Sequence, residues 1–462
     1  MKNIFVKDIV RVCQGKLLYG NDDIACENFS RDSREIKEND VYVGIKGDTF
    51  DGSKFYLDAL EKGAKVCILQ DIDIDLEKLK NYNDIAIVLV DDTILALQQI
   101  ATYKRSLYNI PVVAVTGSVG KTSTKDIIAS VMGEKYNVLK TEGNYNNHIG
   151  VPLTILRLKD HDALVVEMGM SALGEISVLT KIAKPTTCVI TNVGTSHIGE
   201  LGSRENILKA KLEILEGMEQ GGTLIINNDN DMLNMWKKQN NVYKVMTFGI
   251  ENESDLMAKN ITLNADGSTF DVKINNKNYN VKVPVGGKHF VLNSLCALSV
   301  GLINGIEPEK IIEGIAKFEL TKNRMDVEAL PNGSIIINGA YNASFDSMKS
   351  SLEYLSNLSG RKIAVLGDML ELGEFSEELH RNVGKEVVSS NVDILFVCGK
   401  EARYISDEAR KNGMNNSNIF EYDELDKLIV ELKNTIKKDD NILIKASHGM
   451  QFNKVVQELK RG

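Results

Sequence analysis

The chain alternates short apolar runs with longer segments whose apolar residues recur at helical spacing. Three runs, each bounded by Gly, Asn or Asp, occur in the first hundred residues: 40–45, 65–69 and 85–90. They are typical of strands in a small α/β unit. A segment with helical spacing, 93–107, ends shortly before Pro111, which cannot continue a helix. We therefore predict a first domain boundary near residue 108.

The middle of the chain repeats the order of strand, turn and helix. Four apolar runs alternate with predicted helices over 123–133 and 204–218: 112–115, 163–166, 187–191 and 223–226. Near-continuous apolar strands separated by helices indicate a parallel sheet covered on both faces. Residues 245–283 instead alternate polar and apolar positions around the turn Asn275-Asn-Lys-Asn278, which predicts a hairpin with one solvated face.

A second alternating series follows, with apolar runs at 334–337, 362–366, 394–398 and 442–445. This pattern predicts a doubly wound, Rossmann-like domain. The predicted fold is therefore α/β with three domains. They are a small N-terminal α/β domain (1–108), a central parallel-sheet domain (109–320) and a C-terminal Rossmann-like domain (321–462).

Composition agrees with this division. The 462 residues correspond to three domains at about 150 residues each, and 43% hydrophobic with 26% charged residues is typical of folded proteins. The 55 basic and 64 acidic residues give a net charge of -9, which argues against a broad nucleic-acid or anionic-membrane surface. No apolar run approaches the roughly 20 residues of a membrane span, and the N-terminus lacks a signal-peptide core, so we expect a cytoplasmic protein without membrane insertion.

The six cysteines are scattered and form no Cys-x-x-Cys pair. Several lie inside apolar runs, as Cys188 does. This placement favours buried free thiols over metal ligands or disulfides.

A glycine-rich loop, Thr116-Gly-Ser-Val-Gly-Lys-Thr-Ser-Thr124, joins the strand 112–115 to a helical run. Its glycines let backbone amides turn inward, Lys121 supplies a point charge, and the Thr122 hydroxyl can ligate Mg²⁺. The loop departs from the common pattern because Val115 stands at its first position. It still predicts a nucleotide site in a P-loop ATPase-like central domain, against the alternative of an ordinary glycine-rich turn.

Two further polar residues follow the ends of neighbouring predicted strands. Glu167 ends the run 163–166, where a carboxylate could hold a metal, although it could also merely cap the next turn. His197 follows the run 187–191 and could reach a second metal at the same edge of the sheet. A single histidine is otherwise more often structural.

One lysine of the predicted helix 204–218 falls on its apolar side. At about 100° per residue, Lys211 lies inside the arc of Ile207 and Ile214, whereas Lys209 lies on the polar side. Lys211 either extends to water or is held in a low-dielectric site. A buried, neutral amine could add carbon dioxide to form a carbamate, whose two oxygens could bind Mg²⁺.

Several segments recur together in one protein family. Those of the central region are the phosphate loop, Gly143-Asn-Tyr-Asn-Asn-His-Ile-Gly-Val-Pro-Leu153, Val166-Glu-Met-Gly169, Asn192-Val-Gly-Thr-Ser-His197 and Ala210-Lys-Leu-Glu213. The outer segments are Asp32-Ser-Arg34, Gly47-Asp-x-x-Asp-Gly52, Tyr341-Asn-Ala-Ser344 and Leu366-Gly-Asp-Met-Leu-Glu-Leu-Gly-Glu374. Over nearly the whole chain, this set resembles the Mur ligases of bacterial cell-wall synthesis.

The resemblance implies a role for each candidate residue. Those implied to bind ATP are Thr116, Gly117, Ser118, Gly120, Lys121, Thr122, Ser123, His289, Asn293 and Arg324. Those implied to bind the UDP-muramoyl-peptide are Asp32, Ser33, Arg34, Asn144, Asn146 and Asn147. The implied ligands of two Mg²⁺ ions are Thr122, Glu167, His197 and Lys211 as a carbamate. The implied catalytic residues are Lys121, Lys211, His197 and Arg324.

The resemblance also implies the reaction and its partners. The chain is most similar to the ligases that join D-alanyl-D-alanine to UDP-N-acetylmuramoyl-tripeptide. In these the peptide carboxylate attacks the γ-phosphate of ATP, and the dipeptide amine attacks the resulting acyl phosphate. We expect a monomer whose third domain closes over the nucleotide and brings Arg324 to the γ-phosphate.

Four positions depart from the family pattern. Gly339 stands where a carboxylate is usual, Phe345 where proline is usual, His448 where arginine is usual, and Ser53 where histidine is common. The chain could therefore be a divergent paralogue with another acceptor. A related amide ligase, such as a folylpolyglutamate synthetase, or a nucleotide-operated switch would also carry a phosphate loop.

Overall fold

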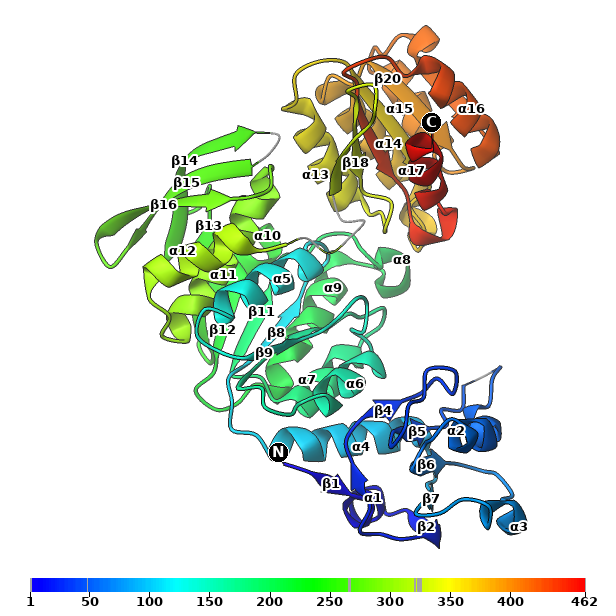
Figure 1. Cartoon of the computed structure of the whole chain (residues 1–462). Coiled ribbons are helices and arrows are strands. Elements are labelled where there is room, and N and C mark those ends of the chain that lie inside the picture. The colour runs from blue at the N-terminus through cyan, green and yellow to red at the C-terminus, as the bar shows by residue number, and fades with distance from the viewer. Residues whose placement is uncertain (1, 48, 265–266, 320, 322–325, 462) are drawn as a thin grey trace.

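The chain folds into three lobes that follow one another along the sequence in the computed structural model (Figure 1). The structure describes residues 2–47, 49–264, 267–319, 321 and 326–461. The predicted three-part α/β organisation is confirmed, and each lobe is built around a mainly parallel sheet. Among the described residues, no helix is long and apolar enough to cross a membrane.

The first lobe contains a five-stranded sheet with the order β2-β7-β6-β5-β4. Its strands are β2 (Lys16–Gly20), β4 (Phe29–Ser30), β5 (Val41–Val43), β6 (Val66–Leu69) and β7 (Ala86–Leu89). Beside it lie the pair β1 (Ile4–Phe5) and β3 (Ala25–Cys26) and the helices α1 (Val6–Cys13), α2 (Tyr56–Glu61) and α3 (Leu76–Leu79). The three predicted apolar runs form the parallel strands β5, β6 and β7.

Helix α4 (Thr93–Ser106) fastens the first lobe to the second. Asp92 caps it by accepting hydrogen bonds from Ile94 N (2.7 Å) and Leu95 N (2.9 Å). The helix packs against α1 on one side and against α6 (Gly150–Leu156) and α7 (Glu175–Ala183) of the second lobe on the other. Near its end, the buried Arg105 donates hydrogen bonds to Ala183 O (2.8 Å), Lys184 O (3.1 Å) and Tyr108 O (2.6 Å).

Replacing Arg105 by Ala is expected to lower the free energy of unfolding by about 3 kcal/mol or more. The side chain is only 4% exposed, so its removal leaves buried carbonyl oxygens without a donor. Urea unfolding followed by circular dichroism measures the loss. The control is Arg403→Ala, which removes a half-exposed pair with Asp423 and should cost less than about 1 kcal/mol. Equal losses in the two variants would contradict this account.

The second lobe contains a nine-stranded sheet with the order β16-β15-β14-β13-β12-β11-β8-β10-β9. Its parallel strands are β8 (Val112–Thr116), β9 (Val138–Lys140), β10 (Ala163–Glu167), β11 (Thr187–Ile190), β12 (Thr223–Asn227), β13 (Lys244–Gly249) and β14 (Leu256–Asn264). The predicted parallel sheet is thereby confirmed. Its helices are α5 (Lys121–Met132), α6, α7, α8 (Ile198–Leu201), α9 (Arg204–Leu212), α10 (Asp231–Gln239), α11 (Lys288–Ile303) and α12 (Pro308–Lys317).

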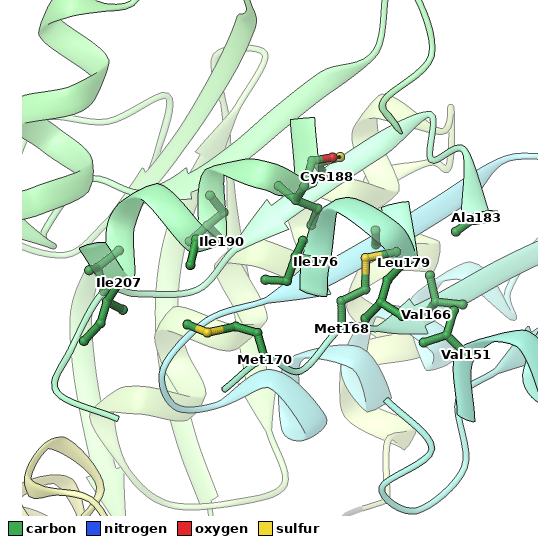
Figure 2. Close-up of a cluster of buried hydrophobic side chains, with 14 of the residues drawn as sticks. Val151, Val166, Met168, Met170, Ile176, Leu179, Ala183, Cys188, Ile190 and Ile207 are labelled. Carbon is green, nitrogen blue, oxygen red and sulfur yellow. Dashed lines mark hydrogen bonds between the residues drawn. The ribbon is translucent and has the colours of Figure 1, made fainter. Parts of the chain in front are cut away.

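Both faces of this sheet are buried, because successive residues of a strand point to opposite sides. Val112 and Ala114 of β8 face the core under α4, α6, α7 and α9, whereas Val113 and Val115 face α5, α11 and α12. Figure 2 shows part of the first core, where Ile176 of α7 and Ile207 of α9 lie near side chains of β10 and β11. The two layers hold the carboxyl ends of the parallel strands in fixed positions.

The predicted hairpin is found as strands β15 (Gly267–Ile274) and β16 (Lys277–Val283), which are joined by Asn275 and Asn276. Both asparagines have positive φ, 47° and 66°, as a type I′ turn requires. The hairpin is not separate from the main sheet, since β15 pairs with β14. Its buried face packs against α11 and α12, and the other face carries exposed polar residues.

The predicted helix 204–218 is wrong at its C-terminal end. The α-helix ends at Leu212, and a 3₁₀ turn follows over Glu213–Gly217. Tertiary contacts explain the change, because the Glu213 carboxylate accepts hydrogen bonds from Gly174 N (2.7 Å) and Ser177 N (3.2 Å) at the start of α7. The contact ties the end of α9 to the positive end of a neighbouring helix.

The third lobe is a six-stranded sheet with the order β17-β18-β22-β19-β20-β21. Its strands are β17 (Asp326–Ala329), β18 (Ile335–Asn338), β19 (Lys362–Gly367), β20 (Ile394–Cys398), β21 (Ile419–Tyr422) and β22 (Asn441–Lys445). Its helices are α13 (Phe345–Ser356), α14 (Ser376–Ser389), α15 (Arg403–Lys411), α16 (Leu425–Thr435) and α17 (Asn453–Lys460). The edge strand β17 is antiparallel to β18, and the other pairs are parallel.

The six cysteines are free thiols, as the sequence predicts. Five are buried, and Cys13 is half-buried. Burial raises the pKa of the Cys13 thiol to about 12, so the thiol form dominates at neutral pH.

Candidate active site

A cavity of about 580 Å³ lies between the central and C-terminal lobes. The central lobe contributes the phosphate loop, the end of β10 and the segment after β11. The C-terminal lobe contributes the residues that follow β18 and β22. Representative lining residues are Lys121, Glu167, His197, Gly339 and Lys445. The cavity therefore brings together several of the side chains that the sequence predicts to be functional.

The phosphate loop is held in one conformation by the neighbouring strand end. Thr191 Oγ1 donates to Val119 O (2.7 Å), and the Asn192 side-chain amide both donates to Val119 O (3.0 Å) and accepts from Val119 N (3.0 Å). A Cβ at Gly117 would lie 1.9 Å from Thr191 Oγ1, so only glycine fits there. The loop is therefore shaped before any ligand arrives.

Lys121 folds back over the loop that precedes it. Its Nζ donates to Gly117 O (2.8 Å) and Ser118 O (3.2 Å). Gly120, with φ of +80°, turns the chain into the first turn of α5, where unpaired backbone N–H groups and the helix dipole favour an anion. The ammonium and the helix N-terminus thus place positive charge at one end of the cavity.

Three buried polar atoms around this loop have no hydrogen-bond partner among the described residues: Thr116 Oγ1, Thr124 Oγ1 and Asn293 Nδ2. Asn293 and Thr124 both lie beside Gly120, where a Cβ would be 3.4 Å from Asn293 Oδ1 and 4.0 Å from Thr124 Oγ1. Unpaired buried polar atoms are costly unless a ligand or water satisfies them. They fit a polyphosphate nucleotide seated on the loop.

Glu167 and Thr122 form a buried pair beside the loop. The Thr122 hydroxyl donates to Glu167 Oε2 (2.8 Å), and Asn146 Nδ2 donates to Glu167 Oε1 (2.8 Å). Glu167 is 1% exposed and Thr122 is fully buried. Mg²⁺ is usually bound by one or two carboxylates together with substrate phosphates, so this hydroxyl–carboxylate pair fits it. The described residues contain no cluster of three or more His, Cys, Asp or Glu side chains that would form a larger metal site.

His197 lies at the start of α8 in the left-handed conformation, with φ of 62°. Its Nδ1 lies 2.8 Å from Glu371 Oε2 of the C-terminal lobe, at ion-pair distance but without the alignment of a hydrogen bond. Burial lowers the pKa of His197, the charge of Lys121 lowers it further, and Glu371 opposes the shift. A neutral imidazole is the form that can bind a metal.

Lys211 on α9 is buried, with only 2% of its surface exposed, and Lys209 on the same helix is exposed. The predicted placement of the two lysines is confirmed. Burial holds the pKa of Lys211 well below its usual value, and the positive charge of Lys121 lowers it further. A lowered pKa favours the neutral amine, which is the form that adds carbon dioxide.

His289 and Asn293 lie at the start of α11 on the cavity wall. Burial lowers the pKa of His289 to about 4, with a further contribution from Lys445. Its Nδ1 lies 3.0 Å from Ser350 Oγ of α13, so the ring bridges the two lobes. A neutral, partly buried ring of this kind offers a flat surface and one hydrogen-bonding nitrogen to a heterocyclic ligand.

Gly339, the position where the resemblance leads us to expect a carboxylate, lines the cavity after β18. Its carbonyl oxygen and that of Asn342 accept hydrogen bonds from Lys445 Nζ at 3.4 and 3.0 Å. A Cβ at Gly339 would lie 3.4 Å from Lys445 Nζ, a tight but permissible approach.

Gly339→Asp is expected to lower the KM for ATP by about tenfold, because it restores the carboxylate that is usual at this cavity position, where it can accept hydrogen bonds from donor groups of the nucleotide. Steady-state kinetics at varied ATP concentration measures the change. Gly339→Asn is the control, since it has the same shape without the charge. A KM in the Asn variant equal to that in the Asp variant would show that charge is not the cause.

Of the remaining predicted residues, only some line the cavity. Asp32 accepts hydrogen bonds from Arg34 N and Nε (both 2.9 Å), and these bonds hold the pKa of Asp32 at about 2. Asp32, Ser33 and Arg34 belong to the first lobe and do not line the cavity. Asn146 and Asn147 do line it, whereas Asn144 does not. Arg324 lies outside the described residues.

Three further departures from the family pattern have local explanations. Ser53 is buried, donates to Gly44 O (3.1 Å) and accepts from Gln70 N (3.1 Å), so it stabilises the turn after β5. His448 is exposed on the cavity rim, with its ring centroid 6.0 Å from that of Tyr341. Phe345 begins α13 and packs against the core.

Four residues that line or lie beside the cavity were not predicted from the sequence. Glu371 and Asp346 of the C-terminal lobe contact the segment after β11. Glu371 lies within a segment that carries the family resemblance, but nothing in that segment indicates which residue of another lobe it meets. Asn227 and Phe248, at the ends of β12 and β13, also line the cavity. Their positions at strand ends were the signal that could have identified them.

Three family models match the chain in the order of its lobes. They are the "Mur ligase family, catalytic domain" over residues 27–105, the "Mur ligase middle domain" over 115–301 and the "Mur ligase, glutamate ligase domain" over 323–448. The UDP-N-acetylmuramoyl-tripeptide--D-alanyl-D-alanine ligase of Bacillus subtilis is 37% identical and is matched over 98% of both chains. The ligase of the same name from Escherichia coli is 31% identical over 95% of this chain and 94% of its own.

Solved structures agree with the sequence relatives. A crystal structure of MurF from Acinetobacter baumannii superposes with a TM-score of 0.90 at 27% identity and covers 100% of both chains. MurF ligase from Thermotoga maritima in complex with ADP superposes with a TM-score of 0.82 at 30% identity, over 94% of this chain and 97% of its own. The resemblance predicted from the motifs is confirmed: the chain belongs to the Mur ligase family, whose members are ATP-dependent ligases.

Proposed function

We propose that the chain joins D-alanyl-D-alanine to UDP-N-acetylmuramoyl-tripeptide at the expense of ATP, in peptidoglycan precursor synthesis. The observation that carries the proposal is the cavity in which Lys121, the Glu167–Thr122 pair, His197 and the opposing C-terminal lobe converge. Full-length relatives with this activity in their names support the choice of substrates.

The residues of the phosphate loop would bind the ATP phosphates. Lys121 would exchange its contacts with Gly117 O and Ser118 O for phosphate oxygens, and the amides at the start of α5 would face the same anion. Arg324 would add a second cation from the start of the C-terminal domain. Two anions, the peptide carboxylate and the γ-phosphate, must approach each other, so positive charge at this point lowers the barrier.

The metal-binding residues of the proposal are Thr122 and Glu167 for one Mg²⁺, and His197 and carbamylated Lys211 for another. Bound Mg²⁺ would neutralise part of the negative charge of the phosphates. The buried position of Lys211 and the downward shift of its pKa support the carbamate, because only the neutral amine adds carbon dioxide. The carbamate would convert a buried amine into an anionic oxygen ligand.

The substrate carboxylate would attack the γ-phosphate to form an acyl phosphate. The dipeptide amine would then attack the activated carbonyl, and phosphate would leave. Closure of the cavity between the two lobes would exclude water from the acyl phosphate. Asp32, Ser33 and Arg34 would hold the uridine diphosphate, and the highly exposed Arg34 side chain has room to turn toward a phosphate. Asn144, Asn146 and Asn147 would line the path of the peptide.

We also infer three domains divided near residues 108 and 320 and a cytoplasmic monomer. Helix α4 packs against both the first and the second lobe. The division near residue 108 is therefore a boundary along the sequence and not a separation of the two lobes in space. Size-exclusion chromatography with light scattering would measure the oligomeric state.

One assay tests the function. The protein is incubated with ATP, Mg²⁺, D-alanyl-D-alanine and UDP-muramoyl-tripeptides that carry either lysine or diaminopimelate, and products are identified by mass. We expect phosphate release that requires both the tripeptide and the dipeptide. Release that is indifferent to both would favour a nucleotide switch. Failure with every tripeptide, in protein shown to be folded, would favour a paralogue with another acceptor.

A further inference from the structure

Two carboxylates of the C-terminal lobe contact one segment of the central lobe, residues 194–201, which we call the docking segment. Asp346 Oδ2 accepts hydrogen bonds from Thr195 N (2.8 Å) and Thr195 Oγ1 (2.9 Å). Glu371 Oε2 lies 2.8 Å from His197 Nδ1, and Glu371 O accepts a hydrogen bond from Gly199 N (3.2 Å). The two lobes are therefore joined by side-chain and backbone contacts within a few residues.

The docking segment is also connected to the phosphate loop. Gly194 N donates a hydrogen bond to Ser118 Oγ (2.9 Å), and Ser118 N donates to Asn192 O (3.1 Å) just before the segment. The segment thus lies between the nucleotide-binding loop and the C-terminal lobe. A displacement of that lobe would act directly on residues bonded to the loop.

The backbone is shaped for close approach at both contacts. A Cβ at Gly194 would lie 2.2 Å from Asp346 Oδ2, and one at Gly199 would lie 2.7 Å from Glu371 O. Glu371 itself has φ of 65°, a left-handed conformation that residues other than glycine rarely adopt. Such conformations persist where the surrounding structure requires them, often at functional sites.

The position of Glu371 bears directly on His197. Its carboxylate lies next to Nδ1, which leaves Nε2 as the ring nitrogen available for a ligand. A histidine that binds a metal through one nitrogen is commonly oriented by a carboxylate at the other. Here that carboxylate comes from a different lobe from the histidine.

We propose that Glu371 is a positioning residue, which orients His197 only when the C-terminal lobe is docked, and that Asp346 is the second attachment of the dock. The inference rests on the proposed function, because it takes His197 to serve the nucleotide site. It adds that the orientation of a residue of the nucleotide site depends on a contact made by another lobe.

Hydrogen–deuterium exchange of the full-length protein reports the dock directly, since Thr195 N and Gly199 N donate to the C-terminal lobe. With Mg²⁺ and a non-hydrolysable ATP analogue, Glu371→Gln should speed exchange in the peptide 193–201 by about tenfold. It should lower kcat by about tenfold and change the KM for ATP by less than about twofold. Glu378→Gln, an exposed carboxylate of α14, is the control and should change none of these.

A second variant tests the same contact by shape. Gly199→Ala suits helix α8 but places a Cβ against Glu371 O, so it should also speed exchange and lower kcat without unfolding either lobe. The proposal would be overturned if both Glu371→Gln and Gly199→Ala showed the exchange rate and the kcat of the wild type. Exchange is measured without sugar nucleotide or dipeptide, so failure of the ligation assay would leave this result interpretable.

Discussion

Lys211→Met is expected to lower kcat by about 10²- to 10³-fold and to raise the stability of the fold at neutral pH. Methionine fills the buried position but cannot carry a carbamate or a charge. The activity falls because the nucleotide site loses a proposed metal ligand. Lys209→Met, two residues away on the exposed side of α9, is the matched control and should keep both activity and stability.

The stability gain has a definite pH dependence. The pKa of Lys211 is lowered in the folded protein, so between this lowered value and the ordinary value of 10.5 unfolding takes up a proton. The unfolded state binds more protons in that window, and wild-type stability therefore rises with pH toward 10.5. Lys211→Met lacks this slope. Urea unfolding at several pH values should show its advantage shrinking as the pH rises, and an unchanged difference would contradict a buried neutral lysine.

Bicarbonate distinguishes the carbamate from a lysine that is merely buried. A carbamate forms only in the folded protein, so bicarbonate should raise the melting temperature of the wild type and not that of Lys211→Met. Native mass spectrometry should show the added carbon dioxide in the wild type alone. A wild-type mass that never changes, with full activity in carbonate-free buffer, would exclude the carbamate.

Glu167→Gln is expected to lower kcat by about 10²- to 10³-fold and to raise the Mg²⁺ concentration needed for half-maximal rate. The amide has the shape of the carboxylate and can still bond both Thr122 and Asn146, so the fold should be retained. The substitution removes one negative charge from a side chain that is 1% exposed. Glu142→Gln, an exposed carboxylate paired with Arg157, serves as the control.

A magnesium titration of the rate separates this role from a structural one. A purely structural Glu167 would change the melting temperature of Glu167→Gln and leave the Mg²⁺ dependence as in the wild type. That result would remove Glu167 from the metal site.

The central part of the site could be predicted because its signals are local. The phosphate loop, Glu167 and His197 each follow the end of an apolar strand, and parallel strands bring such ends to one edge. Helical periodicity alone singles out Lys211, since one turn of α9 fixes which side chains face the core. None of these inferences needs knowledge of how the lobes pack.

What could not be predicted depends on contacts between distant parts of the chain. The helix expected to reach residue 218 ends early because Glu213 bonds the start of α7, more than thirty residues away. The strands β4 and β17 contain no apolar run, and hydrogen bonds to a neighbouring strand complete them. Glu371 meets His197 only through the docking of two lobes.

Helix α4 is attached to both of its neighbouring lobes, and this attachment has a consequence for the length of peptide that the protein accepts. Arg105 attaches the end of this helix to the central lobe through buried hydrogen bonds, so the proposed uridine diphosphate site is linked to the phosphate loop through a helix that packs on both lobes. A UDP-muramoyl-peptide anchored at one end presents its carboxylate at the other only if its peptide has the right number of residues. In that case the distance between the two binding sites, rather than a pocket for any one side chain, would exclude peptides that are one residue too short.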